Sequence, residues 1–204
     1  MIFFEPQSRD RSVFPHDPFK ALVTPRPIGW ISTVSADGVV NLAPYSFFNI
    51  VANRPPYVMF ASAQRKDSQR NAEVSGEFVV SMATWQLREQ MNLTSAAVGP
   101  KVSEPALASL AMAPSVAVKP PRVAASPVAL ECTYTKTVDL PGADGQPHSC
   151  AIIVGAVIGI YIDDEIIVDG LIDMHRAQPI SRIGYMDYAT LGEIFAMQRP
   201  TAPR

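Results

Sequence analysis

The chain has 204 residues, 48% of them hydrophobic, and a formal net charge of −2. This length suits one domain with a substantial core, and the charge argues against nucleic-acid binding, which depends on clustered cations. The amino terminus lacks the apolar region of a signal peptide, and the longest apolar run, 151–162, is too short to span a bilayer. We therefore expect a cytoplasmic protein that does not enter a membrane.

Strand patterns dominate the chain. Runs rich in β-branched and aromatic residues predict strands, in chain order, at 28–35, 39–51, 55–63, 77–83, 127–140 and 149–163. Asp37-Gly38 predicts a hairpin between the first two strands, and the loop 141–147 joins the last two. We expect residues 1–204 to form a single, mainly β domain, a six-stranded antiparallel barrel in which closure removes exposed strand edges.

Helical patterns are short and lie between the strands. They predict helices at 68–75, 86–96, 105–112 and 187–197, as coverings of the barrel. Cys132 and Cys150 stand at different distances from the loop 141–147, so they would not face each other and are expected to be free thiols. Without further ligands nearby, the histidines and cysteines predict no metal site.

The segment QRKDSQRN, residues 64–71, concentrates hydrogen-bond donors between a strand and a helix. With Asp67 or Ser68 as the expected N-cap, the helix start, the Ser68 hydroxyl and the charges of Arg65 and Lys66 suit a phosphate. The alternative is a solvated surface turn, in which Arg70 pairs with Glu73 across one helical turn.

A second informative segment is TPRPIGWISTVSADGVVNLAPYSFFNIV, residues 24–51. Pro44 is expected to interrupt the strand ladder, which would leave backbone groups near Ala43, Tyr45 and Ser46 available to a planar polar ligand. The alternative is an ordinary edge strand that binds nothing.

The motifs PRPIGW, NLAPYSFF, NRPPYVMF, RKDSQRN, GEFVVSM and RIGYMDYATLGEIFAMQRP follow one another in the order typical of a known family. From about residue 14 to 200 the chain resembles the flavin reductase-like family of FMN-binding split barrels. The resemblance implies a Greek-key split barrel, a homodimer and noncovalently bound FMN. It also implies cofactor contacts from Arg65, Lys66 and Ser68 to the phosphate, from Ala43, Tyr45, Ser46 and Phe47 along the isoalloxazine, and from Ser62, Ala63 and Gln64 to the pyrimidine side or ribityl chain.

The activity implied by the resemblance is that of an NAD(P)H-dependent flavin oxidoreductase, which passes electrons to an acceptor or a partner monooxygenase. The flavin carries this chemistry, so only Ser46 and His148 are candidates for a catalytic contribution. The chain has no GxGxxG motif, so NAD(P)H would bind without a Rossmann unit. Alternatives are a non-catalytic FMN-binding electron carrier, redox sensor or flavin store, and a barrel adapted to haem or a deazaflavin.

The roles of four residues, His148, Cys150, Arg182 and Tyr188, stay open within the resemblance. Some reductases of the family carry histidine where this chain has Cys150, so His148 is alternatively a histidine at a loop end. Arg182 and Tyr188 match the family's C-terminal segment, where they would serve either the cofactor or the dimer interface.

Overall fold

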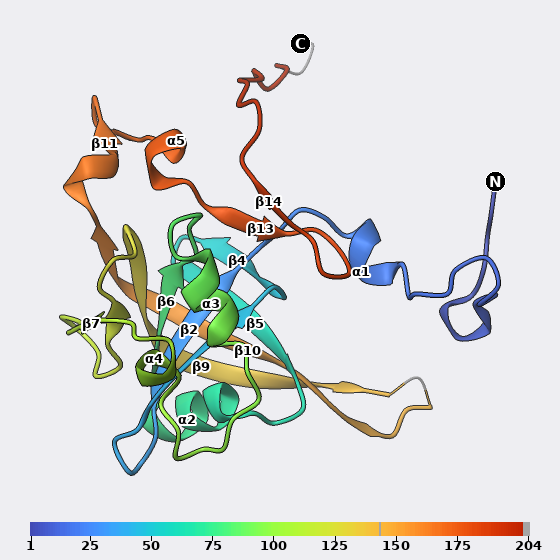
Figure 1. Ribbon diagram of the computed structural model, residues 1–204, viewed down its shortest axis with the longest axis horizontal. Coiled ribbons are helices and arrows are strands. Elements are labelled where there is room, and N and C mark those ends of the chain that lie inside the picture. The colour runs from blue at the N-terminus through green and yellow to red at the C-terminus, as the bar shows by residue number, and fades with distance from the viewer. Residues whose placement is uncertain (143, 202–204) are drawn as a thin grey trace.

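The structure is a computed structural model that describes residues 1–142 and 144–201, except the side chains of 147–149. Its centre is a seven-stranded antiparallel sheet in the order β3-β2-β6-β9-β10-β5-β4 (Figure 1). The strands are β2 (Gly29–Val34), β3 (Val40–Tyr45), β4 (Phe48–Asn53), β5 (Pro56–Ala63), β6 (Glu77–Met82), β9 (Val128–Pro141) and β10 (Pro147–Ile162). The mainly β fold class is confirmed, with a different number of strands.

The difference in strand number arises in the segment 40–53. The expected strand 39–51 is divided into β3 and β4, and the break falls at Ser46 and Phe47, not at Pro44. Pro44 stays in the ladder opposite Trp30, which is possible because β3 pairs with a strand on one side only. β3 and β4 are the two edges of the sheet, so the bent segment 40–53 joins these edges. If β3 and β4 are counted as one bent strand, the sheet has the six strands that were expected.

Both predicted hairpins are present. Between β2 and β3 the backbone N–H of Gly38 donates to the carbonyl of Ser35 at 3.0 Å, and Gly38 has a positive φ of 81° that favours glycine. In the long β9–β10 hairpin Cys132 lies opposite Val157, whereas Cys150 lies opposite Ala63 of β5. The two thiols are therefore far apart in register and free, as expected.

The predicted helices are confirmed in part. Helix α2 (Asp67–Ser75) matches the expected 68–75 closely, whereas α3 (Arg88–Leu93) and α4 (Glu104–Leu107) are shorter than expected. The remaining short elements are η1 (Pro6–Ser8), α1 (Phe19–Leu22), β7 (Met112–Ala113), β8 (Arg122–Val123), η2 (Asp164–Ile166), β11 (Ile167–Val168), β12 (Leu171–Ile172) and α5 (Met174–Ala177). None of the described helices has the length and apolar character needed to cross a membrane.

The helix predicted at 187–197 is wrong. Residues in this region form β14 (Tyr188–Thr190), which pairs with β13 (Ile180–Arg182), and β13 pairs in turn with β1 (Arg26–Pro27). The chain then leaves the barrel without regular structure (Figure 1). Ile194 and Phe195 are exposed, so the apolar face of a helix would have no core to pack against, and a short helix without packing is marginal in water.

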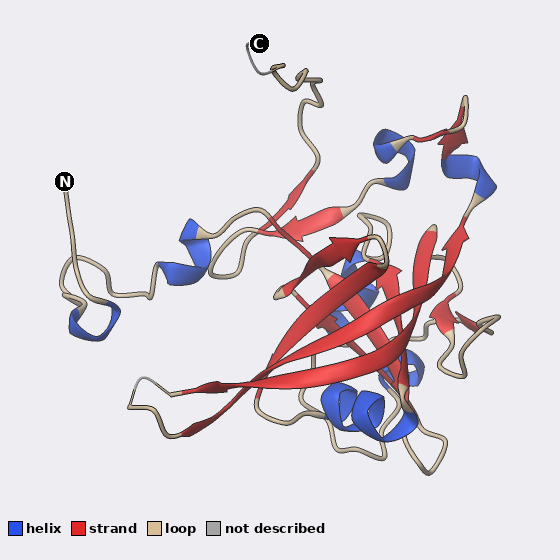
Figure 2. Ribbon diagram, turned by 180° about the vertical axis from the view of Figure 1, so that it is seen from behind, coloured by secondary structure: helices blue, strands red, loops and turns tan. Residues whose placement is uncertain are grey.

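Helix α2 and the barrel share one core, which fixes where the helix begins. Ala72 of α2 packs among buried barrel residues that include Tyr45, Phe60 and Phe78. The ring of Phe60 lies 4.9 Å from that of Tyr45 and 5.5 Å from that of Phe78, measured between centroids. Figure 2 shows α2 lying against one end of the curved sheet. The start of α2 is thereby held next to β3.

Candidate functional site

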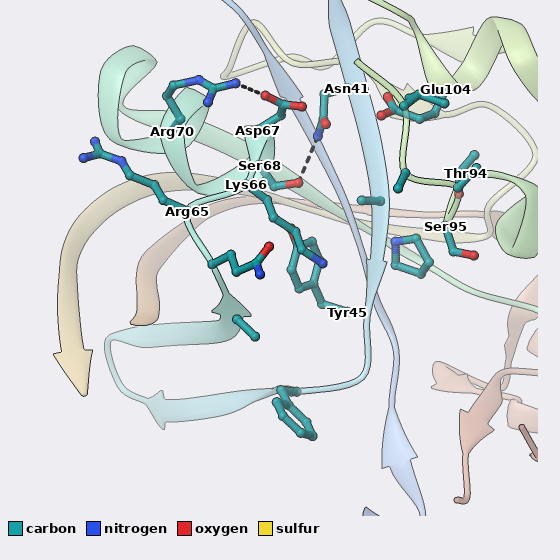
Figure 3. A pocket seen from close by; sticks show the side chains of 18 of the residues that line it. Asn41, Tyr45, Arg65, Lys66, Asp67, Ser68, Arg70, Thr94, Ser95 and Glu104 are labelled. Carbon is teal, nitrogen blue, oxygen red and sulfur yellow. Dashed lines mark hydrogen bonds and ion pairs between the residues drawn. The ribbon is translucent and has the colours of Figure 1, made fainter. Parts of the chain in front are cut away.

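A cavity of about 570 Å³ lies between β3, the start of α2 and the loop that follows α3 (Figure 3). This volume falls within the range of roughly 300–1,000 Å³ that is usual for small-molecule sites. We call residues 63–70 the α2 wall and residues 94–104 the loop wall. The cavity is lined by Lys20, Asn41, Ala43, Pro44, Tyr45, Ser46, Phe47, Ala61, Ala63, Gln64, Arg65, Lys66, Asp67, Ser68, Arg70, Thr94, Ser95, Ala96, Ala97, Val98, Pro100 and Glu104.

The start of α2 opens into this cavity. Its N-cap is Lys66, in extended conformation, and not Asp67 or Ser68 as expected; the Lys66 carbonyl accepts the backbone N–H of Arg70 at 3.0 Å. The N–H groups of the first turn have no partner within a helix, and the helix dipole adds partial positive charge there. The α2 wall therefore presents backbone donors to an anion.

Ser68 belongs to a buried polar network that joins α2 to the sheet. Its Oγ accepts a hydrogen bond from Nδ2 of Asn41 at 2.9 Å. The side-chain amides of Asn41 and Asn71 each donate to Oγ1 of Thr33 at 3.2 Å. Since a hydroxyl that accepts still carries its own proton, Ser68 retains a donor while its position is fixed.

The two adjacent cations of this segment differ in their surroundings. Arg65 forms an ion pair with Glu73, and Arg70 pairs with Asp67, so the pair between Arg70 and Glu73 that was considered as an alternative does not form. Lys66 makes no ion pair with any residue that the structure describes, and Figure 3 shows its side chain directed toward Tyr45 while Arg65 points away. Both residues line the cavity, but of the two only Lys66 has no ion-pair partner among the described residues.

Glu73 is held in its ionised form by its neighbours. It accepts hydrogen bonds from Nε2 of Gln69 at 2.9 Å and from the hydroxyl of Thr137 at 2.7 Å. Burial opposes ionisation, but these hydrogen bonds and the charge of Arg65 together lower the pKa of Glu73 below its usual range. The carboxylate thus holds the guanidinium of Arg65 in an ion pair.

Tyr45 lines the cavity, but its hydroxyl is buried inside the wall. Its side chain is buried, and its hydroxyl makes no hydrogen bond to any described residue. Burial raises the pKa of the Tyr45 phenol, the nearby hydroxyls of Ser68 and Ser62 offset part of this shift, and the charge of Glu104 adds to it. The hydroxyl has almost no accessible surface, so a ligand in the cavity does not reach it.

Nine of the ten residues predicted to contact a cofactor line this one cavity. Ser62 does not: it is buried, and its hydroxyl donates to the carbonyl of Gln64 at 2.7 Å, which supports the positive φ of 73° at Gln64. Ser46 is half-buried and lines the cavity.

The other singled-out positions lie elsewhere. The guanidinium of Arg182 stacks on the ring of Tyr188, with 4.4 Å between Cζ and the ring centroid. The two residues line a separate cavity of about 300 Å³ between α3 and β14. His148 belongs to β10, but its side chain lies outside the described part of the chain. Within residues 1–142 and 144–201, no three His, Cys, Asp or Glu side chains gather as metal ligands.

The sequence reasoning missed the loop wall altogether. It assigned Thr94 and Ser95 to a helix, whereas they follow α3 and face the cavity. Thr94 is anchored because its Oγ1 accepts from the indole N–H of Trp30 at 2.9 Å and donates to the Met91 carbonyl at 2.8 Å. The small residues of TSAA before Gly99-Pro100 were the available signal for a loop at this point.

Comparison with known proteins places this geometry in a family. The flavin reductase like domain model matches residues 22–179. Protein BH2278 of Halalkalibacterium halodurans is 35% identical over 184 residues, which cover 88% of each chain. Nitrilotriacetate monooxygenase component B from Bacillus cereus is 32% identical, with a TM-score of 0.87 over 97% of this chain and 98% of that chain.

A more distant structure shares the fold alone. The FMN-binding protein from Thermus thermophilus is 12% identical, with a TM-score of 0.75 over 96% of this chain and 99% of that chain. The family match, which covers most of the chain, agrees with the resemblance of the motifs. The chain belongs to the flavin reductase-like family, and its fold is a split barrel.

Proposed function

We propose that the chain binds FMN noncovalently in the cavity between β3 and α2 and acts as an NAD(P)H-dependent flavin oxidoreductase. The observation that carries this proposal is the convergence of two features on one cavity. The free first turn of α2, with Lys66 and Ser68, suits a phosphate. The bent segment 43–47 offers backbone groups and the Phe47 side chain to a planar ring.

The residues present fit FMN in chemical type. Lys66, the Ser68 hydroxyl and the first-turn N–H groups bind the phosphate, and Tyr45 forms part of the cavity wall beside the cofactor. Ala43, Ser46 and Phe47 lie along the ring, while Ala63 and Gln64 contact its pyrimidine side or the ribityl chain. Arg65 contributes less than the motif implied, because it is paired with Glu73.

FMN supplies hydride transfer with a nicotinamide when it is bound. The chain's own residues hold and orient it: the segment 43–47 supports one side of the cavity, and the loop wall limits access of water from the other. Ser46 stands in the segment where it would contact the reactive edge of the ring. No proton-transferring side chain is required of the protein.

The proposed assembly is a cytoplasmic homodimer that supplies electrons to a small acceptor or a monooxygenase. The name of the Bacillus cereus protein, a monooxygenase component, supports a partner of this type. Exposed apolar side chains on β4 and β10, among them Ile50, Val51 and Ile160, support burial of parts of these strands against a second copy.

Two measurements test the function. FMN added to the purified protein should bind with a change in flavin fluorescence, whereas a haem spectrum or failure to bind FMN would reject the proposal. Under anaerobic conditions NADH or NADPH should bleach the bound flavin at a catalytic rate. Tight FMN binding without bleaching by either nucleotide would instead identify an electron carrier, redox sensor or flavin store.

A further inference from the structure

Glu104 places a buried carboxylate in the cavity, on the side opposite the start of α2 (Figure 3). It is the first residue of α4 and is only 6% exposed. Its Oε2 accepts a hydrogen bond from the backbone N–H of Leu42 at 3.1 Å. Within the described part of the chain Glu104 makes no ion pair, so its charge is not neutralised by a neighbouring cation.

The contact with Leu42 does not explain why this residue is charged. Burial raises the pKa of Glu104 above its usual range even though backbone N–H groups of Glu104 and Leu42 donate to it, which means that ionisation is unfavourable in this position. A neutral acceptor such as a glutamine carbonyl would satisfy the Leu42 N–H without that cost. The negative charge therefore indicates a task beyond anchoring the edge of β3.

Glu131 shows what a purely structural buried carboxylate looks like in the same protein. It is 4% exposed, and its two oxygens accept the backbone N–H groups of Val116 and Ala117 at 2.9 and 2.6 Å. Glu131 does not line the cavity. Both of its oxygens are thus satisfied by the protein, whereas Glu104 has one such partner outside its own residue and retains acceptor capacity.

The chemistry of Glu104 restricts what it can bind. An ionised carboxylate only accepts hydrogen bonds, and it repels a phosphate, which suits the opposite wall with Lys66. FMN carries mostly acceptors: its donors are the ribityl hydroxyls and the ring N3–H. Building on the proposed function, we infer that Glu104 is a flavin-binding residue that accepts a hydrogen bond from one of these donor groups.

This role has a signature that a structural role lacks. If Glu104 is kept ionised for the ligand, removing its charge makes the protein without ligand more stable and the complex with flavin weaker. A carboxylate that serves only to anchor β3 shows no loss of flavin affinity. The two readouts, stability and affinity, therefore move in opposite directions only when Glu104 contacts the flavin.

The test compares wild type, Glu104→Gln and the matched control Glu131→Gln by fluorescence titration with FMN, riboflavin and lumiflavin. Glu104→Gln should bind FMN and riboflavin about tenfold more weakly, as expected for loss of a hydrogen bond to a charged group, and Glu131→Gln should bind both like wild type. Lumiflavin has the ring N3–H but no ribityl hydroxyl. Unchanged lumiflavin binding by Glu104→Gln identifies a hydroxyl as the donor, and an equal loss identifies N3–H.

Different negative results would overturn the role of Glu104 and the proposed FMN site. FMN affinity of Glu104→Gln within about twofold of wild type overturns the role of Glu104 and leaves the FMN site standing. A wild-type protein that does not bind FMN overturns the proposed function, and the role of Glu104 with it. If Glu104→Gln does not fold, Glu104→Asp is used; it keeps the charge but withdraws it by one methylene, and an affinity equal to wild type overturns the inference.

Discussion

The two walls of the cavity differ in charge and in how they are held. The α2 wall carries Lys66 and the positive end of a helix, and a network of buried side chains fastens it to the sheet. The loop wall carries the carboxylate of Glu104 and rests on the hydrogen bond between Trp30 and Thr94. A polarised cavity of this kind can orient a ligand that has an anionic end and a donor-bearing remainder. The predictions below test this division of roles, beginning with the largest effect.

The largest effect is expected at Asn41, which joins the α2 wall to the sheet. Asn41→Leu removes hydrogen bonds to Ser68 and Thr33 and leaves both buried hydroxyls without this donor, so the free energy of unfolding should fall by about 2–3 kcal/mol. Denaturant unfolding measures this loss. On the loop wall, Thr94→Val removes the acceptor of the Trp30 indole N–H and the donor to the Met91 carbonyl, and it should cost about 1–2 kcal/mol. Equal losses at both sites would show that the walls are held alike.

A somewhat smaller effect distinguishes the two adjacent cations. Lys66→Ala should weaken FMN binding by about 2 kcal/mol, roughly thirtyfold, and leave riboflavin binding unchanged, since only FMN carries a phosphate. The loss should shrink at high salt. Arg65→Ala is the matched control and should change FMN affinity less than about threefold, because Arg65 is exposed and paired with Glu73. A larger loss at Arg65 than at Lys66 would reverse their assignment.

Ionisation of Glu104, on the loop wall, should lower the free energy of unfolding as pH rises. The pKa of Glu104 is raised above the usual value of 4.5, so the native state binds more protons than the unfolded state above that pH. The free energy of unfolding of the wild type should therefore fall as pH rises from 4.5 to the raised pKa of Glu104, and it should stay lower at higher pH. Glu104→Gln should be more stable than wild type at neutral pH, by an amount on the order of 1 kcal/mol, and the difference should vanish below pH about 4. Thermal unfolding across pH provides the measurement.

The smallest effect has the opposite sign and belongs to Glu73, which lies on α2 beyond the α2 wall and pairs with Arg65 of that wall. The pKa of Glu73 is lowered below 4.5, so its contribution to stability is present above that pH and is lost as pH falls through the lowered value. Glu73→Gln should cost about 0.5 kcal/mol at neutral pH and nothing in acid, where the wild-type carboxyl is protonated. If Glu73→Gln and Glu104→Gln shift stability in the same direction at pH 7, the contrast between the walls does not hold.

Much of the fold was predictable because its signals are local. Alternating β-branched runs, the turn at Asp37-Gly38 and the donor-rich start of α2 each occupy a few neighbouring residues, and the structure confirms the elements they predict. The helix expected at 187–197 shows the limit of such signals. Its apolar spacing is compatible with a helix, but pairing of β14 with β13 competes with it, and that competition depends on residues far apart in the chain.

The sequence by itself determined most of the strands, the hairpins and the donor-rich segment 64–71 at the start of α2, because propensity, turn chemistry and clustered charge act over short distances. Only the tertiary structure decided which of these groups meet. It paired Arg65 with Glu73, directed Lys66 to the cavity, and brought Glu104 to the edge of β3 across 62 positions of sequence. The physical reason is that burial and hydrogen-bond partners are set by packing of distant segments, and these two quantities determine whether a charged side chain stabilises the fold or serves a ligand.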